Sequence, residues 1–359
     1  MKTSDLNKKM NSAIMFCVKI VLVLSITLAS CGLLNFLLVP TLDSSVVGIS
    51  MIDANRQEDN IDIMMMGTSR TYRGVDAPYL SEELNKNVFD IVSNSATYVS
   101  IYHLLVELCK NNTPEKVFLE VSSVNFKRDT GTEDEYIYHL LTGENKEEYK
   151  NAISLDYSDL GIFEFVNYLK NFANGKFTQN VSYKLNPLPL GSTDYYDNCE
   201  YRGKGFSYAN ATCEGKEMVL PNSYLTNGDA WEEEHLNEKA LEYFYKIIDY
   251  CNANNIELVL YSLPYPKIII EKYYDDFTQF DISLHSYIDK YDDLVYLDFT
   301  KVKSQFMDLS TDYFYNANHC NGTGADVLSP IISEIMKEIE SNTYQYNNWF
   351  YDTYEQLFV

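Results

Sequence analysis

Residues 61–74 read IDIMMMGTSRTYRG, an apolar run that ends abruptly at Gly67 and continues as Thr68-Ser69-Arg70. A short apolar run bounded by turn residues is typical of a buried strand. The strand is therefore expected to break into a tight turn that carries a hydroxyl group. Two interpretations of Ser69 are open: it is a nucleophile, or it caps the helix that follows.

Four further apolar runs follow this one, at residues 87–92, 116–121, 256–264 and 294–299. Stretches with helical periodicity lie between or after them, at 75–85, 100–111, 238–255, 277–291 and 324–341. Strands that alternate with helices indicate a parallel sheet covered on both faces. The expected fold class is α/β, a three-layer α/β/α sandwich around a mostly parallel five-stranded sheet.

This α/β pattern is interrupted once, over residues 126–237, which are acidic and rich in Tyr and Asn. We interpret 126–237 as a large insertion or lid, so that the α/β domain comprises 61–125 and 238–340. Residues 341–359 are an aromatic tail that is expected to pack back on this domain. Within the insertion, Cys199 and Cys213 flank a loop-like stretch, and they either form a disulfide or remain reduced thiols.

The N-terminal region predicts a membrane anchor. Residues 20–39 contain no charge, and about 20 apolar residues span a bilayer. Lysines precede this run and acidic residues follow it, which predicts a cytoplasmic segment 1–19, a transmembrane helix 20–39, a linker 40–60 and an extracytoplasmic main domain. Because Leu28-Ala29-Ser30-Cys31 resembles a lipoprotein processing box, lipidation at Cys31 and ordinary signal cleavage are the alternatives.

The charge balance argues against nucleic acid as a partner. The chain has 28 Lys and Arg against 52 Asp and Glu, a net charge of −24, so a phosphate backbone would be repelled. The sequence contains no Cys/His cluster with the spacing of a zinc site. We therefore expect no metal and no nucleotide or other cofactor.

Reactive groups in an open parallel sheet gather beyond the C-terminal ends of the strands. Ser69 follows the first strand, Ser93-Asn94-Ser95 follows the second, and DYFYNANHCNGTGA, which contains His319, comes after the fifth. Of the five histidines, only His319 lies in a polar turn after a strand. His319 is thus the predicted general base for Ser69, unless Asn318 and His319 merely cap the final helix.

These residues resemble a known family. Gly67-Thr68-Ser69-Arg70 resembles the first block of the SGNH/GDSL hydrolase superfamily, in which a strand-terminal Gly-x-Ser carries the nucleophile. NANHCNGTGA is similar to the last block, Asp-x-x-His-Leu-Asn-x-x-Gly-Ala, and matches it at His319, Asn321, Gly324 and Ala325. The anchor and YRGKGF (201–206) resemble the membrane-anchored, extracytoplasmic branch, which includes the teichoic-acid D-alanyl transfer protein DltD and the alginate O-acetylation proteins. The resemblance implies the flavodoxin-like SGNH fold over 61–125 and 238–340.

The chain departs from this pattern at two places. The Asp expected three residues before the His is Asn316, and a neutral amide can orient an imidazole but cannot stabilise its charged form. Either Asp312 or Asp298 replaces that carboxylate, or His319 works in a dyad held by a backbone carbonyl. The Gly-x-Asn-Asp block has no clean counterpart, because the third strand ends in Glu120-Val121-Ser122-Ser123. The expected oxyanion hole is therefore the Ser69 backbone N–H with the Asn94 side chain.

Arg70 and Arg73 place two positive charges beside Ser69. As substrate-binding residues they would recognise a phosphate or carboxylate on a polymer. The structural interpretation, which the sequence favours, is that they pair with Asp76 or Glu82.

The expected function is that of a cell-envelope serine acyltransferase or esterase of SGNH type. It would move an acyl group such as acetyl to or from a surface polysaccharide or a teichoic-acid-like polymer. The resemblance implies an envelope glycopolymer as acceptor and a multipass membrane O-acyltransferase as the source of acyl groups. The competing hypothesis is a catalytically lapsed subunit that binds glycans or supports assembly, with the Tyr-rich insertion providing stacking surfaces.

Overall fold

The computed structural model describes residues 3–38, 45–153, 199–209, 236–291 and 293–359. The chain divides into two units, Met1–Ser44 with Asp156–Pro187 and Ser45–Leu155 with Leu188–Val359, and each is described by itself. In the first unit, α1 (Thr3–Leu38) is one continuous helix. Its stretch Ile14–Leu34 is long and apolar enough to cross a membrane.

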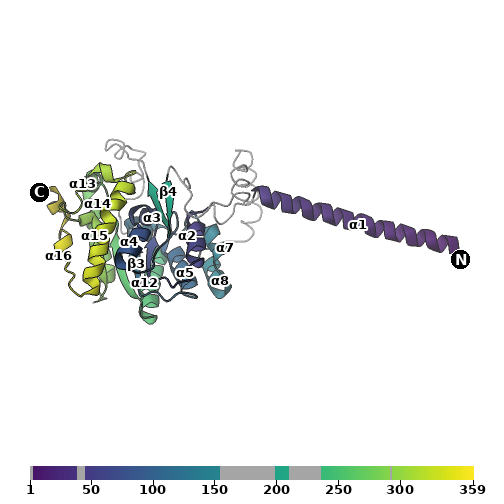
Figure 1. The fold of residues 1–359 in the computed structure, drawn as a ribbon, viewed down its shortest axis with the longest axis horizontal. Coiled ribbons are helices and arrows are strands. Elements are labelled where there is room, and N and C mark those ends of the chain that lie inside the picture. The colour runs from purple at the N-terminus through teal and green to yellow at the C-terminus, as the bar shows by residue number, and fades with distance from the viewer. Residues whose placement is uncertain (1–2, 39–44, 154–198, 210–235, 292) are drawn as a thin grey trace. The chain divides into compact units, whose positions relative to one another are not determined.

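The second unit is built around a five-stranded parallel sheet with the order β2-β1-β3-β6-β7 (Figure 1). The strands are β1 (Ile63–Gly67), β2 (Val88–Val92), β3 (Lys116–Glu120), β6 (Glu257–Ser262) and β7 (Val295–Asp298). Each strand lies within one of the five apolar runs of the sequence. The predicted α/β fold class is confirmed.

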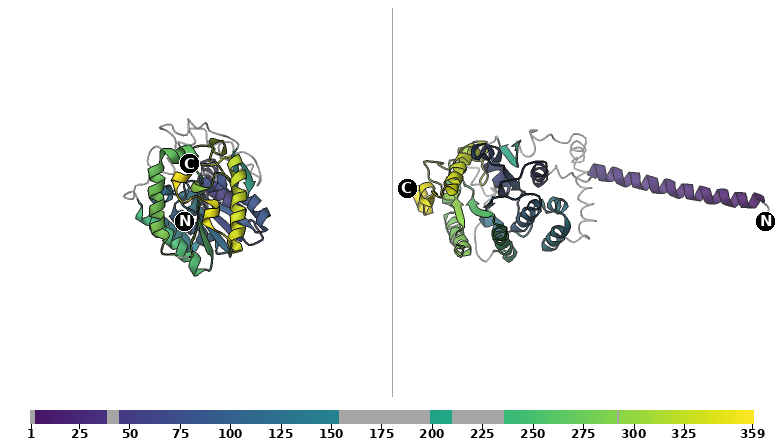
Figure 2. Two further views of the ribbon diagram at one scale, coloured as in Figure 1. Left: turned by 90° about the vertical axis from the view of Figure 1, so that its left-hand side faces the viewer. Right: turned by 60° about the horizontal axis from the view of Figure 1, so that its bottom comes forward.

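Side chains alternate across each strand, so the sheet supports two cores. Met64 and Met66 pack on one face, whose helices are α2 (Val46–Asn55), α5 (Tyr98–Leu108), α12 (Glu238–Ala253) and α14 (Tyr274–Ile288). Ile63 and Met65 pack on the other, whose helices are α4 (Ala77–Leu84), α13 (Lys267–Lys272) and α15 (Gly322–Glu340). Figure 2 shows helices on both sides of the sheet.

Helix α2 lies where the sequence predicts a linker. Ser45 caps the helix by accepting a hydrogen bond from the Gly48 N–H at 2.9 Å. Val47, Met51 and Ala54 are buried in the core beneath β2. The segment differs from a linker because these apolar residues recur at helical spacing, although over too short a window to stand out among its polar neighbours.

The expected insertion contains regular structure in its described parts. Helices α7 (Asp134–Leu140) and α8 (Gly143–Ala152) follow α6 (Ser123–Lys127), and β4 (Cys199–Gly203) pairs with β5 (Phe206–Ala209) in an antiparallel hairpin. The hairpin lies against β2, where the Asp90 N–H donates to the Lys204 carbonyl at 2.9 Å. Gly205 is required there, because a Cβ would lie 2.0 Å from the Asp90 carbonyl oxygen. Cys213 lies outside the described residues, so its disulfide with Cys199 stays a prediction.

The C-terminal residues pack on the same face as α15. This segment contains α16 (Tyr346–Trp349) and the short helix η5 (Tyr354–Phe358). Phe350 forms a bridge to Val302, and Phe350, Tyr354 and Leu357 are buried. Two further short helices, η3 (Phe299–Lys301) and η4 (Thr311–Tyr313), lie between β7 and the loop that carries His319.

Candidate active site

The turn after β1 presents the Ser69 hydroxyl because Thr68, and not Ser69, caps the helix that follows. Helix α3 (Ser69–Gly74) begins at Ser69, and the Thr68 Oγ1 accepts a hydrogen bond from the Arg70 N–H at 3.2 Å. The cap that the sequence offered as the alternative role of Ser69 is thus supplied by its neighbour. This leaves the Ser69 Oγ for another partner.

Glu120, at the C-terminal end of β3, holds this turn in place. Its carboxylate accepts hydrogen bonds from the Thr68 N–H at 2.7 Å, the Thr68 hydroxyl at 2.9 Å and the Thr71 hydroxyl at 2.9 Å. Glu120 is fully buried. Gly67 leaves room for it, since a Cβ at that position would lie 2.5 Å from the carboxylate. Glu120, at the end of β3, therefore fixes the backbone of the turn after β1, from which Ser69 projects.

His319 reaches the site on a loop that closes on itself. The Tyr315 N–H donates to the His319 carbonyl at 2.9 Å. Asn321 caps α15 by accepting from the Gly324 N–H at 2.9 Å. The helix cap is thus Asn321, not Asn318 or His319, and the imidazole is available to the cleft.

The structure brings the side chains of Ser69 and His319 together, with 2.7 Å between the Ser69 Oγ and the His319 Nε2. On the far side of the ring, Nδ1 lies 2.9 Å from the Asn316 Oδ1. That oxygen also accepts from the backbone N–H groups of Asn318 and His319, at 3.1 and 3.0 Å. An amide oxygen only accepts, so this network assigns the proton to Nδ1 and leaves Nε2 to accept from Ser69.

The two aspartates considered as substitutes for the missing carboxylate lie elsewhere. Asp312 is in η4, and its backbone carbonyl accepts from the Asn321 side chain at 2.8 Å. Asp298 ends β7, where it accepts from the Thr300 N–H at 3.1 Å and pairs with Lys301 at 3.3 Å. Because Nδ1 has a single N–H to donate, the position behind the imidazole belongs to Asn316.

The imidazole is held in its neutral form. Burial, followed by the positive charges of Arg73 and Arg70, holds the pKa of His319 well below its ordinary value of 6.5. Neutral imidazole is the form that a general base requires. The neighbouring Cys320 is buried, which raises the pKa of its thiol to about 12, so Cys320 is not a competing nucleophile near neutral pH.

Ser69 and His319 open onto a cleft of about 480 Å³. Its walls come from the turn after β1, the loop after β2, the start and end of α6, and the His319 loop. This volume lies within the range of pockets that hold small molecules, roughly 300–1,000 Å³. The cleft therefore has space for a sugar or polyol unit beside the hydroxyl and the imidazole.

Asn94, the proposed side-chain donor of the oxyanion hole, lines this cleft. Its Oδ1 accepts from the Tyr72 hydroxyl at 3.1 Å, and burial raises the pKa of Tyr72 to about 12, so that hydroxyl keeps its proton. The Asn94 backbone N–H donates to Glu133 at 2.7 Å, and Glu133 also accepts from the Val46 N–H at the start of α2. The backbone of Asn94 is thus tied to α2. Its side-chain Nδ2 donates one N–H to the Glu133 Oε1 at 3.5 Å, which leaves its second N–H for the cleft.

Arg70 serves the architecture of the site. Its Nε donates to the Asn318 carbonyl at 3.0 Å, and its Nη2 donates to the Leu263 carbonyl at 2.6 Å. The guanidinium also lies 4.0 Å from the centre of the Tyr265 ring and 3.7 Å from the Glu120 carboxylate. Arg70 thereby ties the His319 loop and the loop after β6 to the nucleophile turn.

Arg73, one helical turn further on, lines the cleft and is 6% exposed. Its guanidinium lies 4.7 Å from the centre of the Tyr315 ring. The expected pairing of the two arginines with Asp76 or Glu82 is not found among the described residues, because Asp76 instead caps α4. The charge of Arg73 is left facing aromatic rings and the cleft.

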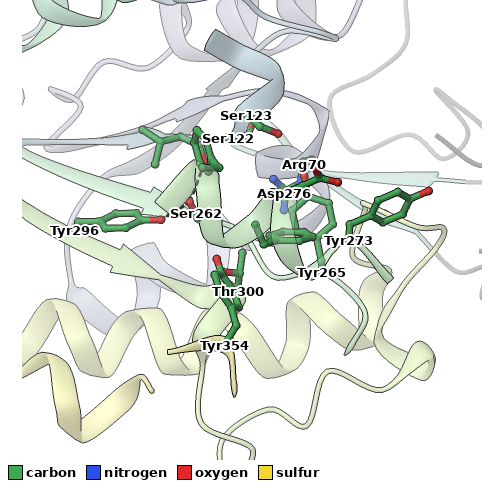
Figure 3. A pocket seen from close by; sticks show the side chains of 13 residues that line it. Arg70, Ser122, Ser123, Ser262, Tyr265, Tyr273, Asp276, Tyr296, Thr300 and Tyr354 are labelled. Atoms are coloured by element: carbon green, nitrogen blue, oxygen red, sulfur yellow. Dashed lines mark hydrogen bonds between the residues drawn. The ribbon is translucent and has the colours of Figure 1, made fainter. Parts of the chain in front are cut away.

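A second cavity lies behind Arg70 and Tyr265, which line both spaces. Figure 3 shows it, with the Arg70 guanidinium beside the Tyr265 ring and the Ser262, Thr300 and Tyr296 side chains around it. Its volume of about 30 Å³ suits a few water molecules at most. Neither Ser69 nor His319 lines it, whereas both line the larger cleft.

The sequence predicts no role for Glu120 or Glu133, although Glu120 positions the turn that carries Ser69 and Glu133 positions Asn94. The signal for Glu120 was present, since it is a charged residue at the end of the apolar run KVFLEV. Glu133 lies in a polar stretch of the insertion and gives no such signal. Among the described side chains, no group of three or more His, Cys, Asp and Glu could hold a metal ion.

Comparisons with known proteins were made by sequence and by structure. No protein-family model matches it, and no curated protein sequence matches it. Among solved structures, the chain is similar to the crystal structure of a proposed acylhydrolase from Bacteroides fragilis NCTC 9343, with 12% sequence identity and a TM-score of 0.40. That match covers 82% of this chain and 96% of the other. A likeness at this level assigns neither family nor activity.

Proposed function

We propose that this chain is a serine acyl-transfer enzyme of the SGNH type, an esterase or an O-acyltransferase. The observation that carries the proposal is the 2.7 Å contact between the Ser69 Oγ and the His319 Nε2, with Asn316 at Nδ1 and a cleft of about 480 Å³ in front. A hydroxyl, an adjacent base and a residue that orients the base are the parts of an activated nucleophile. The resemblance of residues 67–70 and 316–325 to SGNH blocks supports the same assignment.

In the proposed reaction, the Ser69 Oγ attacks the carbonyl carbon of an ester while its proton passes to the His319 Nε2. The carbonyl oxygen becomes an oxyanion, which the Ser69 backbone N–H and the Asn94 Nδ2 would stabilise. The bond to the leaving alcohol breaks, and the proton on Nε2 passes to that alcohol, leaving an acyl-Ser69 ester. A second hydroxyl, from a sugar, a polyol or water, then gives its proton to the His319 Nε2 and attacks the acyl carbon. The bond from that carbon to the Ser69 Oγ breaks, and the proton on Nε2 returns to the Oγ.

A binding-only function is the second candidate, and one observation favours it. Asn316 is neutral, so nothing behind the ring opposes the positive charge that the imidazole gains when it takes the Ser69 proton. A lapsed enzyme would keep the fold and the cleft and would bind a glycan without turning it over. Glycan binding that survives both Ser69→Ala and His319→Ala, without turnover by the unmodified chain, would favour this candidate.

The direct test is labelling of the full-length chain with a fluorophosphonate probe, which reacts with activated serines. We expect the unmodified chain to be labelled and Ser69→Ala to remain unlabelled. Ser341→Ala is a suitable control, since Ser341 is an exposed residue at the end of α15. Equal labelling of the unmodified chain and Ser69→Ala would show that Ser69 is not the reactive group.

We further propose that the enzyme acts on the outer side of a cell membrane, on an envelope glycopolymer such as a polysaccharide or a teichoic-acid-like polymer. The apolar stretch of α1 and the charges that flank it support an anchor with a cytoplasmic N-terminus. A multipass membrane O-acyltransferase would supply acyl groups from within. A phosphatase that is active only outside the cytoplasm, fused after Val359, should be active in cells, and an inactive fusion would contradict this orientation.

A further inference from the structure

The cleft in front of Ser69 differs in charge from the chain as a whole. The chain carries a net charge of −24. The described residues that line the cleft nevertheless include Arg70, Arg73 and Arg128 and contain no aspartate or glutamate. Such a local excess of positive charge within an acidic chain points to a ligand that carries negative charge.

Of the two arginines beside Ser69, Arg73 is the one whose guanidinium is not bonded to backbone carbonyls in the described part of the chain. Its side chain is 6% exposed, and its Nε has no hydrogen-bond partner among the described residues. Arg70 differs, because its guanidinium is already bonded to backbone carbonyls and lies beside Glu120. The Arg73 guanidinium contacts the Tyr72 hydroxyl and the Tyr72 and Tyr315 rings, but it pairs with no carboxylate among the described residues. A buried charge without a counter-charge is costly, and an anion in the cleft would reduce that cost.

A second donor in the same cleft is also unsatisfied. Asn125 is 1% exposed, and its Oδ1 accepts a hydrogen bond from the Ser122 hydroxyl. This contact assigns the Nδ2 as a donor, and the Nδ2 has no partner in the described part of the chain. An oxyanion supplies several acceptor oxygens, whereas a neutral hydroxyl supplies one. These two donors are buried in the cleft wall and have no hydrogen-bond partner among the described residues. They therefore fit a carboxylate or a phosphate better than an uncharged sugar.

We propose that the cleft takes an ester substrate with an anionic group, a carboxylate or a phosphate, near the acyl group, and that Arg73 pairs with that anion. The inference rests on the proposed acyl-transfer function and names its substrate class. Arg128, which follows α6, adds a second positive charge to the cleft wall.

Anion binding would also tune the base. The charge of Arg73 is one of the causes that lower the pKa of His319. A substrate anion paired with Arg73 offsets that charge, so the imidazole becomes a stronger base when the substrate is in place. A neutral ester cannot produce this effect.

The kinetic test compares two esters on the full-length chain: para-nitrophenyl acetate, and the same ester with a carboxylate beside the nitro group. Charge-assisted hydrogen bonds contribute about 1.5–3 kcal/mol, so we expect a KM roughly tenfold or more lower for the carboxylate ester. Arg73→Gln should abolish this difference in KM, and Arg73→Lys should retain part of it. Arg56→Gln, at the exposed residue that follows α2, should retain all of it. An unchanged difference in Arg73→Gln overturns the proposal, as does an equal loss of kcat for both esters, which would make Arg73 part of the oxyanion hole.

A binding measurement separates this inference from the question of turnover. Ser69→Ala is titrated by calorimetry with inorganic phosphate, glucuronate and glucose. We expect the anions, but not glucose, to bind, and Arg73→Gln in the same background to weaken that binding roughly tenfold or more. The anion that binds more tightly identifies the source as phosphate or carboxylate. Equal binding of glucose and the anions, or no effect of Arg73→Gln, would overturn the proposal even if Ser69 proves reactive.

Discussion

The side chain behind the His319 imidazole determines how strong a base that imidazole can be. Asn316 orients the ring, but it adds no charge to stabilise the protonated form. Its Oδ1 receives three N–H groups, from Nδ1 and from the backbone of Asn318 and His319. A carboxylate oxygen would suit this position better than an amide oxygen, because the three N–H groups would stabilise its negative charge.

Asn316→Asp should therefore raise kcat/KM for para-nitrophenyl acetate by roughly tenfold or more. The proposed reaction needs neutral His319, and the pKa of that group is lowered, so the acidic limb of kcat/KM in the unmodified chain should lie below pH 6.5. A carboxylate at residue 316 favours the imidazolium, so the variant's limb should shift to higher pH. A variant with lower kcat/KM and an unmoved limb would contradict the assigned role of residue 316.

At the residue scale, the sequence pairs Ser69 with His319 from their order along the chain and from the turns in which they lie. It could not choose the group behind the imidazole, because Asn316 and Asp312 are both within a few residues of His319 and only the loop geometry separates them. The roles of Glu120 and Glu133 cannot be predicted from the sequence for a different reason. The chain has 52 Asp and Glu, and the sequence does not distinguish those that are buried from those that face water.

At the scale of the elements, the ends of β1 and β3 act as one unit. Glu120 lies at the end of β3, and its carboxylate accepts hydrogen bonds from the turn after β1. The donors are the Thr68 N–H, the Thr68 hydroxyl and the Thr71 hydroxyl. It also balances Arg70, which ties down the His319 loop. The nucleophile turn and the base loop are thus held by a single buried carboxylate.

Replacing this carboxylate should weaken both the fold and the site. Glu120→Gln places an amide N–H₂ among groups that themselves donate, so we expect the free energy of unfolding to fall by about 2–3 kcal/mol. Labelling of Ser69 should slow in the same variant. Urea denaturation checks the first effect, with Glu115→Gln as control, because Glu115 pairs with Lys86 at an exposed site and should cost at most about 1 kcal/mol. Equal losses in the two variants would contradict the role given to Glu120.

The elements themselves were predictable to different degrees. The five parallel strands are apolar runs flanked by turns, and each was found from the sequence. Helix α2 and the β4–β5 hairpin were not found, because long-range contacts hold them in place. Glu133 receives the first N–H groups of α2, and Lys204 pairs with the edge of β2. Neither contact leaves a periodic signal in the sequence.

At the scale of the whole molecule, two opposite electrostatic effects meet at the cleft. A net charge of −24 repels an anionic substrate at long range, whereas Arg73 attracts it at contact. Salt acts on them unequally, since the screening length falls from about 30 Å at 0.01 M to about 8 Å at 0.15 M and buried contacts are screened much less.

Raising the salt concentration over this range should therefore increase kcat/KM for the carboxylate ester, because the repulsion is screened before the contact is. The kcat/KM of the neutral ester should change little, since neither effect acts on it. Dividing kcat/KM for the carboxylate ester by that for the neutral ester therefore removes general effects of salt on the protein. Arg73→Gln should keep the salt response of the carboxylate ester, because the long-range charge of the chain is almost unchanged, but at a lower kcat/KM throughout. If kcat/KM for the carboxylate ester instead falls steadily with salt, the arginines dominate the field at every distance, and the acidic surface has no part in selecting the substrate.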